Sequence, residues 1–399
     1  MKYWRGYLAA AIFAAISWAL IQLGKTYTEL VDMIYPYFTR MIQDFLANWT
    51  GSVDFVVWQL LAVVLGVILL CSIVLMIVLR WNPIQWFGWV AAVASLLFLL
   101  HTGLYGLNNY AGPLADDIKL NVSDFTVNEL AEATAYYRDM ANSLANKVKR
   151  DQNGDVVFPE FDELAEQAAD GFHTLTYKDY YAVFAGCDLP VKKLGWSDMY
   201  TAMGITGYTF SLTAEAAVNP DIPPVSLPFT MCHEMAHRMS IAIERDANFA
   251  AFLACQANSS LEFQYSAYFM AYRYCYYALA SANTTSSATL SGRIAAEANK
   301  NLRHDMDSYS QFFASRKDET LTTIGDTVNE TYIKVNGDDM GLKSYDEVYN
   351  LLVNWHIQTV VLPQHVVDEG PKFDPFDETQ VDLSGLPHTP VPTEAVEEP

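Results

Sequence analysis

The sequence is short of charge, and above all of positive charge. Only 18% of the 399 residues are charged, and 24 Lys and Arg stand against 46 Asp and Glu. Soluble domains usually carry about 25% charged residues. Nucleic acids are bound through basic patches, so this balance excludes nucleic acid as an expected partner. The aromatic content of 14% excludes a chain that is disordered throughout.

Cysteines are few, and their spacing excludes the common cysteine motifs. There are five, an odd number, and no two of them form a CxxC pair. Cys71 falls inside a long apolar run, while Cys187, Cys232, Cys255 and Cys275 come later in the chain. We therefore expect buried free thiols rather than a cysteine zinc site or a disulfide framework.

Apolar residues are abundant and gather in three uncharged runs near the N-terminus, about residues 7–23, 55–79 and 84–107. About 20 apolar residues are needed for a helix to cross the bilayer core. The runs predict three transmembrane helices and the lipid bilayer as a partner. The first run could also be a cleaved signal peptide, but it lacks a clear small-residue cleavage site, which favours an anchor.

Basic residues beside these runs predict the orientation in the membrane. Lys2 and Arg5 precede the first run, and Arg80 lies in the tight turn between the second and third. The positive-inside rule places these residues in the cytoplasm and the chain after Asn108 outside the cell membrane. Residues 24–54, between the first two runs, are expected to form a loop.

The charge divides the chain into parts. Residues 1–110 have a net charge of +1, and residues 111–399 have −23. We expect a membrane anchor over 1–110, a domain over 111–365, and an acidic, Pro-rich, disordered tail over 366–399. Helical periodicity dominates the middle part, and residues 204–213 are β-rich. The predicted fold is mainly α: three N-terminal transmembrane helices, then an α-rich α+β domain with a small edge β-segment. Helices are expected over residues 127–149, 161–169, 228–257, 261–282, 294–314 and 321–336.

One motif carries chemistry, His233-Glu-Met-Ala-His237, which has the pattern HExxH. Positions i and i+4 of a helix lie within about 40° of each other, so both imidazoles face one point. They can bind Zn²⁺ at about 2.0–2.1 Å. Glu234 is angled toward the open coordination position, where it acts as general base on zinc-activated water. The motif predicts a zinc metallopeptidase acting on a peptide or protein substrate.

A catalytic zinc site needs a third protein ligand. The metzincin pattern HExxHxxGxxH fails, because Ser240 stands at the glycine and Ile243 at the third histidine. Glu244-Arg-Asp-Ala-Asn248 follows instead. In the gluzincin style such a Glu binds zinc, and the residue four positions later orients the first histidine.

We therefore expect Glu244 as the third ligand and Asn248 as its supporting residue, with Asp246 as the alternative ligand. On a continuous helix Glu244 would lie about 10 Å beyond His237, too far to share an ion. The chain must therefore reverse within residues 238–243.

These segments resemble a bacterial membrane family, DUF3810. The resemblance rests on Cys232–His237 with Glu244–Phe249 and on Gly204–Gly207, Glu215–Asn219, Ser226–Pro228, Phe263–Tyr268, Asn329–Gly337 and Ser344-Tyr345. It extends over nearly the whole chain to about residue 362, including the N-terminal spans. It implies a multi-pass protein with a zincin-like domain and zinc peptidase activity, without an established substrate. The sequence departs from the family pattern at Ser240, where the resemblance implies that glycine is usual.

Two further features leave alternatives open. Six tyrosines and Arg273 gather within residues 265–277, where one of them could stabilise an oxyanion, although a core position is favoured. Glu215 either supports the metal site or lies exposed on a strand. The alternative function is a non-catalytic zincin-fold scaffold that binds a partner at the cell surface.

Overall fold

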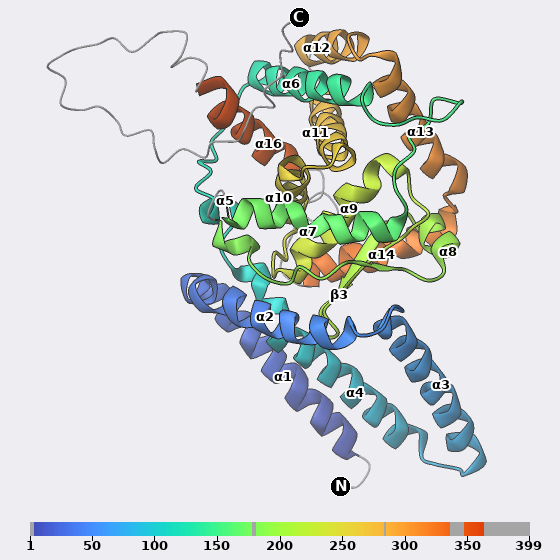
Figure 1. The fold of residues 1–399 in the computed structure, drawn as a ribbon. Coiled ribbons are helices and arrows are strands. Elements are labelled where there is room, and N and C mark those ends of the chain that lie inside the picture. Colours follow the sequence, from blue (N-terminus) through green and yellow to red (C-terminus); the bar gives the residue numbers. More distant parts are fainter. Residues whose placement is uncertain (1–3, 178–180, 283–284, 336–346, 363–399) are drawn as a thin grey trace, which may run out of the picture.

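The computed structural model describes residues 4–177, 181–282, 285–335 and 347–362. These form a bundle of apolar helices and a larger domain that stands on one end of it (Figure 1). The predicted acidic tail over 366–399 and the pair Ser344-Tyr345 lie outside the described residues.

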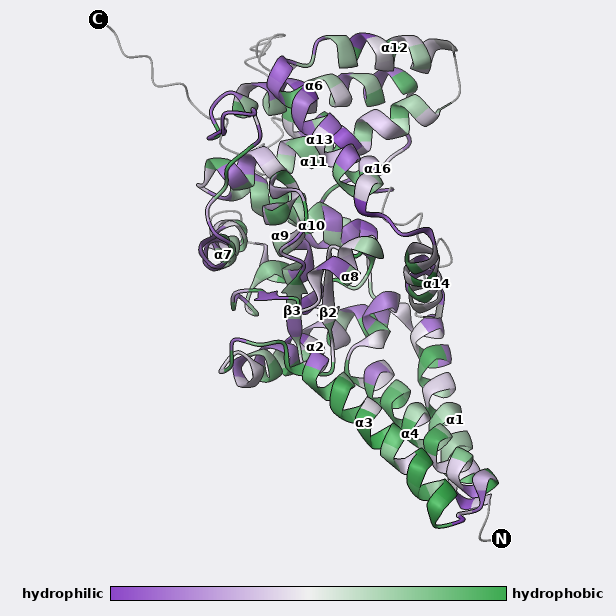
Figure 2. Cartoon of the chain, turned by 90° about the vertical axis from the view of Figure 1, so that its right-hand side faces the viewer, coloured by the Kyte–Doolittle hydropathy of each residue, from purple (hydrophilic) through white to green (hydrophobic). Residues whose placement is uncertain are grey.

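Three helices in the described residues are long and apolar enough to cross a membrane: α1 (Arg5–Thr26), α3 (Val57–Val78) and α4 (Pro83–Leu104). They correspond to the three predicted runs, and Figure 2 shows their apolar character against the more polar domain. The N-terminal end of α1 and the α3–α4 turn lie at the same end of the bundle, away from the domain (Figure 1). This arrangement fits a membrane protein.

Helices α1 and α4 pack closely through small residues. A Cβ added at Gly6 would lie 2.4 Å from the carbonyl carbon of Gly88, so the two backbones are almost in contact. Such close approach is typical of helices that associate in lipid. Helix α3 contacts α4 through Trp86, whose Nε1 donates to the Ser72 hydroxyl at 3.1 Å, and Gln59 near its start is its only buried residue. Most of its other residues are exposed, a surface suited to lipid.

The predicted loop over residues 24–54 is wrong. The chain there forms helix α2 (Thr28–Thr50), which lies across the domain-facing ends of the spans (Figure 1). Pro36 stands inside this helix and removes one backbone donor. The hydroxyl of Thr39 donates nearby, 3.0 Å from the carbonyl oxygen of Tyr35. The helix nevertheless continues through the proline to Thr50.

Glu215 has neither of the roles predicted for it. It is buried, and its carboxylate accepts hydrogen bonds from the backbone N–H groups of Val57 (2.7 Å) and Trp58 (2.9 Å). Lys192 Nζ lies 2.7 Å from the same carboxylate, and the Thr213 hydroxyl donates to it at 2.8 Å. A carboxylate suits this place because the first amides of a helix lack partners and carry partial positive charge. Glu215 thus caps α3 from the domain.

The domain is mainly helical, as predicted, but two expected helices are each divided. Residues 228–257 form α9 (Leu227–Arg238) and α10 (Glu244–Ala257), and residues 294–314 fall in α12 (Thr285–Ala296) and α13 (Lys300–Arg316). Helix α13 begins after Asn299, whose side chain accepts a hydrogen bond from Leu302 N at 2.8 Å and so caps the helix. The other helices of eight or more residues in the domain are α6 (Val127–Ala145), α7 (Phe161–Tyr177), α11 (Leu261–Ser281), α14 (Glu319–Val335) and α16 (Val348–His356).

The predicted β-segment is a small three-stranded sheet. Its strands are β1 (Lys192–Lys193), β2 (Gly207–Phe210) and β3 (Glu215–Val218), in the order β1-β3-β2. β3 pairs with β1 in parallel and with β2 in antiparallel fashion, Gly207 opposite Val218. Within the described residues β2 has no strand partner on its other side, and α9 packs against both β2 and β3.

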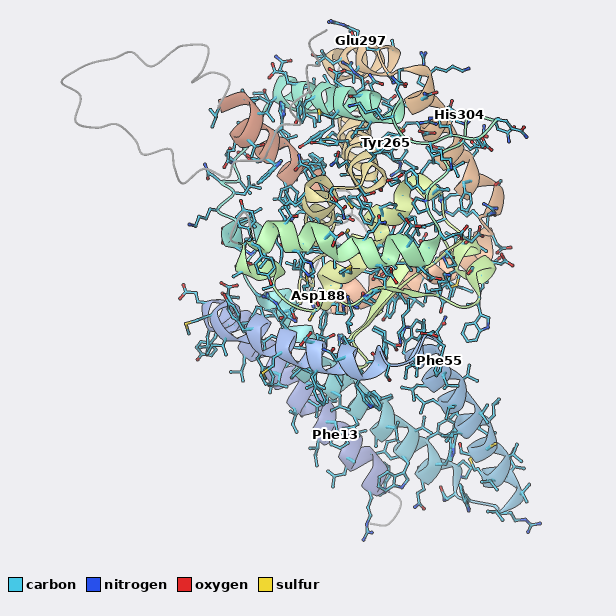
Figure 3. The ribbon with its side chains drawn as sticks, in the orientation of Figure 1. Phe13, Phe55, Asp188, Tyr265, Glu297 and His304 are labelled. Atoms are coloured by element: carbon cyan, nitrogen blue, oxygen red, sulfur yellow. The ribbon has the colours of Figure 1, made fainter. Side chains whose placement is uncertain are left out.

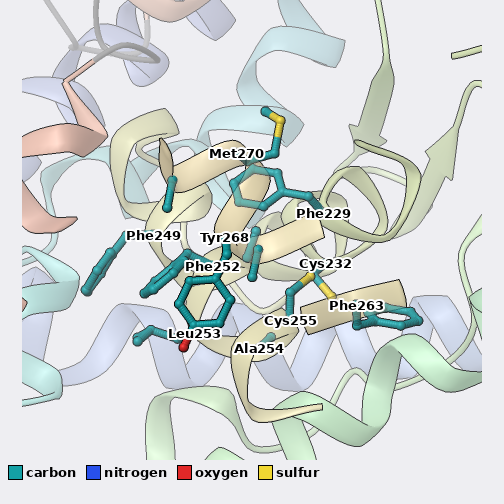
Figure 4. Packing of buried hydrophobic residues seen from close by; sticks show 14 of the residues in the cluster. Phe229, Cys232, Phe249, Phe252, Leu253, Ala254, Cys255, Phe263, Tyr268 and Met270 are labelled. Carbon is teal, nitrogen blue, oxygen red and sulfur yellow. The ribbon is translucent and has the colours of Figure 1, made fainter. Parts of the chain in front are cut away.

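The core of the domain is built around α9, α10 and α11. Phe252 of α10, Tyr268 of α11 and Cys232 of α9 meet there (Figure 4). The tyrosine-rich helix α11 belongs to this core, and Figure 3 places Tyr265 well inside the domain, far from Phe13 in the spans. All five cysteines are free thiols, and the four outside the spans are buried, as predicted.

Candidate metal centre

Helix α9 carries the HExxH residues. It begins with Pro228 in its first turn, where the missing N–H costs no hydrogen bond. His233 and Glu234 are buried, and His237 is half-buried one turn further on. The side chains of His233 and His237 lie on one face, as the spacing predicts, with ring centroids 4.6 Å apart.

The chain reverses directly after α9, so Glu244 can approach His237, which it could not do on a continuous helix. Ser240 adopts a left-handed conformation, with φ 73°. Its N–H bonds the carbonyl of His237 at 2.9 Å, and Ile241 N bonds the carbonyl of Ala236 at 3.1 Å. This is the Schellman arrangement that ends helices, in which glycine is usual. Here the hydroxyls of Ser240 and of Thr39 in α2 are hydrogen-bonded at 2.9 Å, which helps to offset the strain.

Helix α10 then begins at Glu244 and returns its carboxylate to the two histidines. His233 Nε2 and His237 Nε2 lie 3.1 Å apart, and Glu244 Oε2 lies 3.3 Å and 3.2 Å from them. Two ligands bound to Zn²⁺ at about 2.0–2.1 Å in tetrahedral geometry are about 3.3–3.4 Å apart. The three atoms thus fit one face of a zinc tetrahedron, and no fourth His, Cys, Asp or Glu of the described residues joins the group.

The ring of His237 is held in the orientation that a ligand needs. Its Nδ1 lies 2.8 Å from the carbonyl oxygen of Ile241. Because a carbonyl only accepts, Nδ1 carries the hydrogen, and Nε2 of the neutral ring has a lone pair directed at the site. The turn that reverses the chain therefore also orients the second histidine.

The electrostatics of this group favour positive charge. Burial opposes a charge on Glu244, yet its pKa is held well below the ordinary range by His237 and His233. Burial also lowers the pKa of His237, but the charge and hydrogen bond of Glu244 outweigh this and raise it to about 9. A buried carboxylate between two imidazoles attracts a cation, whether a proton or a metal ion.

Glu234 points toward the same space and is held by strand β2. The hydroxyl of Thr209 lies 2.7 Å from Oε2 of Glu234 and 2.8 Å from the backbone carbonyl oxygen of Glu234. Burial raises the pKa of Glu234 above its usual value, although the neighbouring histidines work against this. A Cβ added at Gly207 would lie 2.4 Å from Oε1, so the strand backbone runs directly against this carboxylate.

A cavity of about 180 Å³ opens over these residues. Strand β2 forms one wall, helix α14 forms another, and the segment directly after span α4 contributes to a third. Its lining residues are Tyr105, Asn109, Met203, Ile205, Gly207, Tyr208, Thr209, His233, Glu234, His237, Ala242, Ile243, Glu244, Gly325, Val328 and Asn329. Residues 207–209 of β2 therefore line the same cavity as the two histidines and Glu234.

The alternative ligand lies elsewhere. Asp246 points away from the histidines and accepts hydrogen bonds from Leu114 N (3.0 Å) and Arg245 Nε (3.1 Å). Asn248 is buried one turn after Glu244, and its role in orienting His233 stays a prediction.

Several cavity residues were not predicted. Among the tyrosines of α11, none lines the cavity; the tyrosines that do are Tyr105 and Tyr208. The β-rich segment before the motif was the signal for Tyr208 and Thr209. Nothing in the local sequence marks Tyr105, because the hydrogen bond from its hydroxyl to the carbonyl of His237, at 2.8 Å, spans 132 positions.

Comparison with known proteins gives one match. The family described as protein of unknown function (DUF3810) matches residues 32–353, which is most of the chain. The match begins inside α2, so it includes the second and third spans but not the first, and is narrower than the resemblance had implied. No curated protein and no solved structure matches the chain.

Proposed function

The chain belongs to the DUF3810 family of proteins of unknown function, and we propose that it is a membrane-anchored zinc metallopeptidase with a zincin-like domain. One observation carries the proposal: three ligand atoms separated by 3.1–3.3 Å lie beside a second buried carboxylate, that of Glu234, in a cavity bordered by strand β2. A purely structural site needs ligands, but it does not need this extra carboxylate.

Each of these residues has a separate role in the proposed reaction. His233, His237 and Glu244 hold Zn²⁺, which when bound acidifies water and polarises a carbonyl. Glu234 takes the proton of the attacking water and passes it to the leaving amine. Its raised pKa suits it to hold that proton between the two steps. Thr209 fixes the carboxylate in place through the 2.7 Å hydrogen bond.

Strand β2 is the proposed platform for substrate. An exposed strand edge binds an extended peptide through main-chain hydrogen bonds, and β2 leads such a peptide past Glu234. Tyr208, on the same strand, lines the cavity, and burial raises its pKa to about 12, so its hydroxyl is a donor at neutral pH. We assign it to the oxygen of the carbonyl under attack.

The proposed location follows from the charges near the spans. With Arg80 and the N-terminus in the cytoplasm, the domain lies on the outer side of the cell membrane. The structure supports this only in part: it places the α3–α4 turn and the start of α1 together, at the end opposite the domain (Figure 1).

The test compares the full-length chain, purified in detergent, with Glu234→Gln. Both should bind one equivalent of zinc by mass spectrometry. Only the wild type should cleave a fluorogenic peptide library, with a loss of about 10²–10⁴-fold in the variant. Glu132→Gln, an exposed change on α6, is the matched control and should behave as wild type.

Two outcomes would contradict the proposal in different ways. Absence of stoichiometric zinc in the wild type would refute the metal centre. Bound zinc without cleavage that depends on Glu234 would instead favour the non-catalytic scaffold.

A further inference from the structure

Helix α2 exposes a broad apolar face. Eight of its large apolar side chains are 45–72% exposed. At 100° per residue they fall within about 160° of the helix circumference. They are Leu30, Met33, Ile34, Tyr37, Phe38, Met41, Phe45 and Trp49. Few soluble surfaces leave so many large apolar groups together, so this face has a partner.

The opposite face of α2 is bonded to the domain. Gln43 Nε2 donates to the carbonyl of Ser211 at 2.9 Å, and the Thr50 hydroxyl donates to that of Thr213 at 3.1 Å. Thr39 and Gln43 are fully buried. The apolar face is therefore turned away from the domain, toward the side on which the membrane helices run (Figure 1).

Two of the four charged side chains of α2 are bonded to groups away from this face. Arg40 donates to the carbonyls of Met239 (3.2 Å) and Ala182 (3.0 Å) in the domain. Asp32 accepts a hydrogen bond from Gly112 N at 2.8 Å, just after span α4. An amphipathic helix of this kind lies in the plane of the bilayer surface, with its apolar side in the acyl-chain boundary.

Continuity with the spans identifies the partner as lipid. Only Tyr27 separates α2 from α1, and residues 51–56 join it to α3. Both neighbours are candidate membrane helices, so α2 lies at the level where they leave the bilayer.

Helix α9, which carries the HExxH residues, is hydrogen-bonded to α2 and to the residue after α4 at the same level. Ser240 and Met239, at its end, are the partners of Thr39 and Arg40 of α2. Tyr105 directly follows the last residue of span α4, lines the cavity, and donates to the carbonyl of His237 at 2.8 Å. The metal ligand is therefore one hydrogen bond away from the end of a membrane helix.

From these contacts we propose that the apolar face of α2 binds the bilayer surface and holds the cavity mouth there, so that the substrate is a membrane-anchored polypeptide cleaved close to its anchor. The proposed lipid contact depends only on the geometry of α2. The substrate class rests on the proposed peptidase function.

The lipid contact is tested by spin labelling of the full chain in vesicles of phosphatidylethanolamine and phosphatidylglycerol. Met41→Cys and Phe45→Cys are labelled in a Cys71→Ser background, with Gln311→Cys on the exposed side of α13 as control. Labels at 41 and 45 should collide more with oxygen than with a water-soluble nickel chelate, and the label at 311 should do the reverse. Labels at 41 and 45 that behave like the control would refute the lipid contact.

The substrate class is tested with one library-derived donor–quencher peptide, fixed to lipid through a linker of 5 or 25 residues. These linkers reach about 17 Å and 85 Å when extended. A cavity at the membrane surface cleaves the short-tethered peptide at least as fast as the long one. Cleavage of the long-tethered peptide alone would place the cavity far from the bilayer and overturn the inference.

The double variant Met41→Glu/Phe45→Glu links the two tests. It should lower the ratio of short-tether to long-tether cleavage by about tenfold, because α2 no longer holds the domain down. Gln311→Glu should leave the ratio unchanged, and an unchanged ratio in the double variant would count against α2. If the wild type cleaves neither peptide, the peptidase function and the substrate class both fail, while the spin-label result still decides the lipid contact.

Discussion

Replacement of Gly207 by alanine should disable catalysis while leaving the metal centre filled. An added Cβ would lie 2.4 Å from Oε1 and 2.8 Å from Cδ of Glu234, where ordinary contact begins at about 3.4 Å. Either the strand or the carboxylate must move by about 1 Å. The strand is paired with β3 along its length, and Thr209 holds the carboxylate at 2.7 Å. The carboxylate is the end of a flexible side chain, so we expect it to give way.

A displacement of about 1 Å in a reacting group can cost about 100-fold in rate, which corresponds to about 2.7 kcal/mol of transition-state stabilisation. Glu234 is not one of the three metal ligands, so zinc content should stay at one equivalent. The expected signature of Gly207→Ala is therefore a lower kcat with unchanged zinc.

The assay is cleavage of the fluorogenic peptide library by the full-length protein, with zinc measured on the same samples. Gly292→Ala is the matched control, because nothing lies within 4 Å of the added Cβ in helix α12. It should keep full activity and gain about 0.5–1 kcal/mol of stability. Wild-type kcat in Gly207→Ala would show that the position of Glu234 does not limit the reaction, and would refute the reasoning.

Three other predictions concern metal uptake, the cap of α3 and the cavity tyrosine. Zinc binding at pH 7 should release about one proton from His237, because its raised pKa of about 9 keeps it protonated at pH 7. The release should fade as the pH rises above about 9, and titration calorimetry in two buffers measures it. Glu215→Gln should cost about 3 kcal/mol, because Lys192 loses a buried charged partner; thermal unfolding in detergent measures it. Tyr208→Phe should lower kcat about 100-fold with little change in KM.

Each of these has a result that would count against it. Proton release that is the same at pH 7 and pH 10 would show that Glu244 does not hold a proton on His237. Glu132→Gln is the control for Glu215→Gln. Equal melting temperatures for the wild type and Glu215→Gln would contradict the proposed cap. Tyr177→Phe, an exposed change, is the control for Tyr208→Phe. Full activity in Tyr208→Phe would show that Tyr208 does not donate to the oxyanion.

The sequence was most informative where spacing alone decides geometry. The i, i+4 pair predicts that His233 and His237 face one point, and the structure has them so. Length and hydropathy likewise predicted the three spans. Glu244 was harder, because its approach depends on the tight turn at Ser240, and that turn is supported by a hydroxyl 201 positions earlier in the chain, at Thr39.

Two features escaped prediction for different physical reasons. Uncharged runs do not indicate helix α2, because four charged residues and Pro36 interrupt its sequence. Its apolar residues do recur at helical spacing, so periodicity could have found it. The role of Glu215 could not have been found in this way, since its partners at Val57 and Trp58 are separated from it by more than 150 residues.

The capping of α3 by Glu215 has a consequence for biogenesis. Synthesis proceeds from the N-terminus, so α3 is inserted long before residue 215 leaves the ribosome, and its first amides wait for the sheet to form. Once β3 pairs with β2, the same strand that aligns the cavity edge also locks a membrane helix. A domain released from its spans would keep a buried carboxylate and lose two of its donors. We therefore expect the sheet beside the cavity to lose stability when the spans are removed.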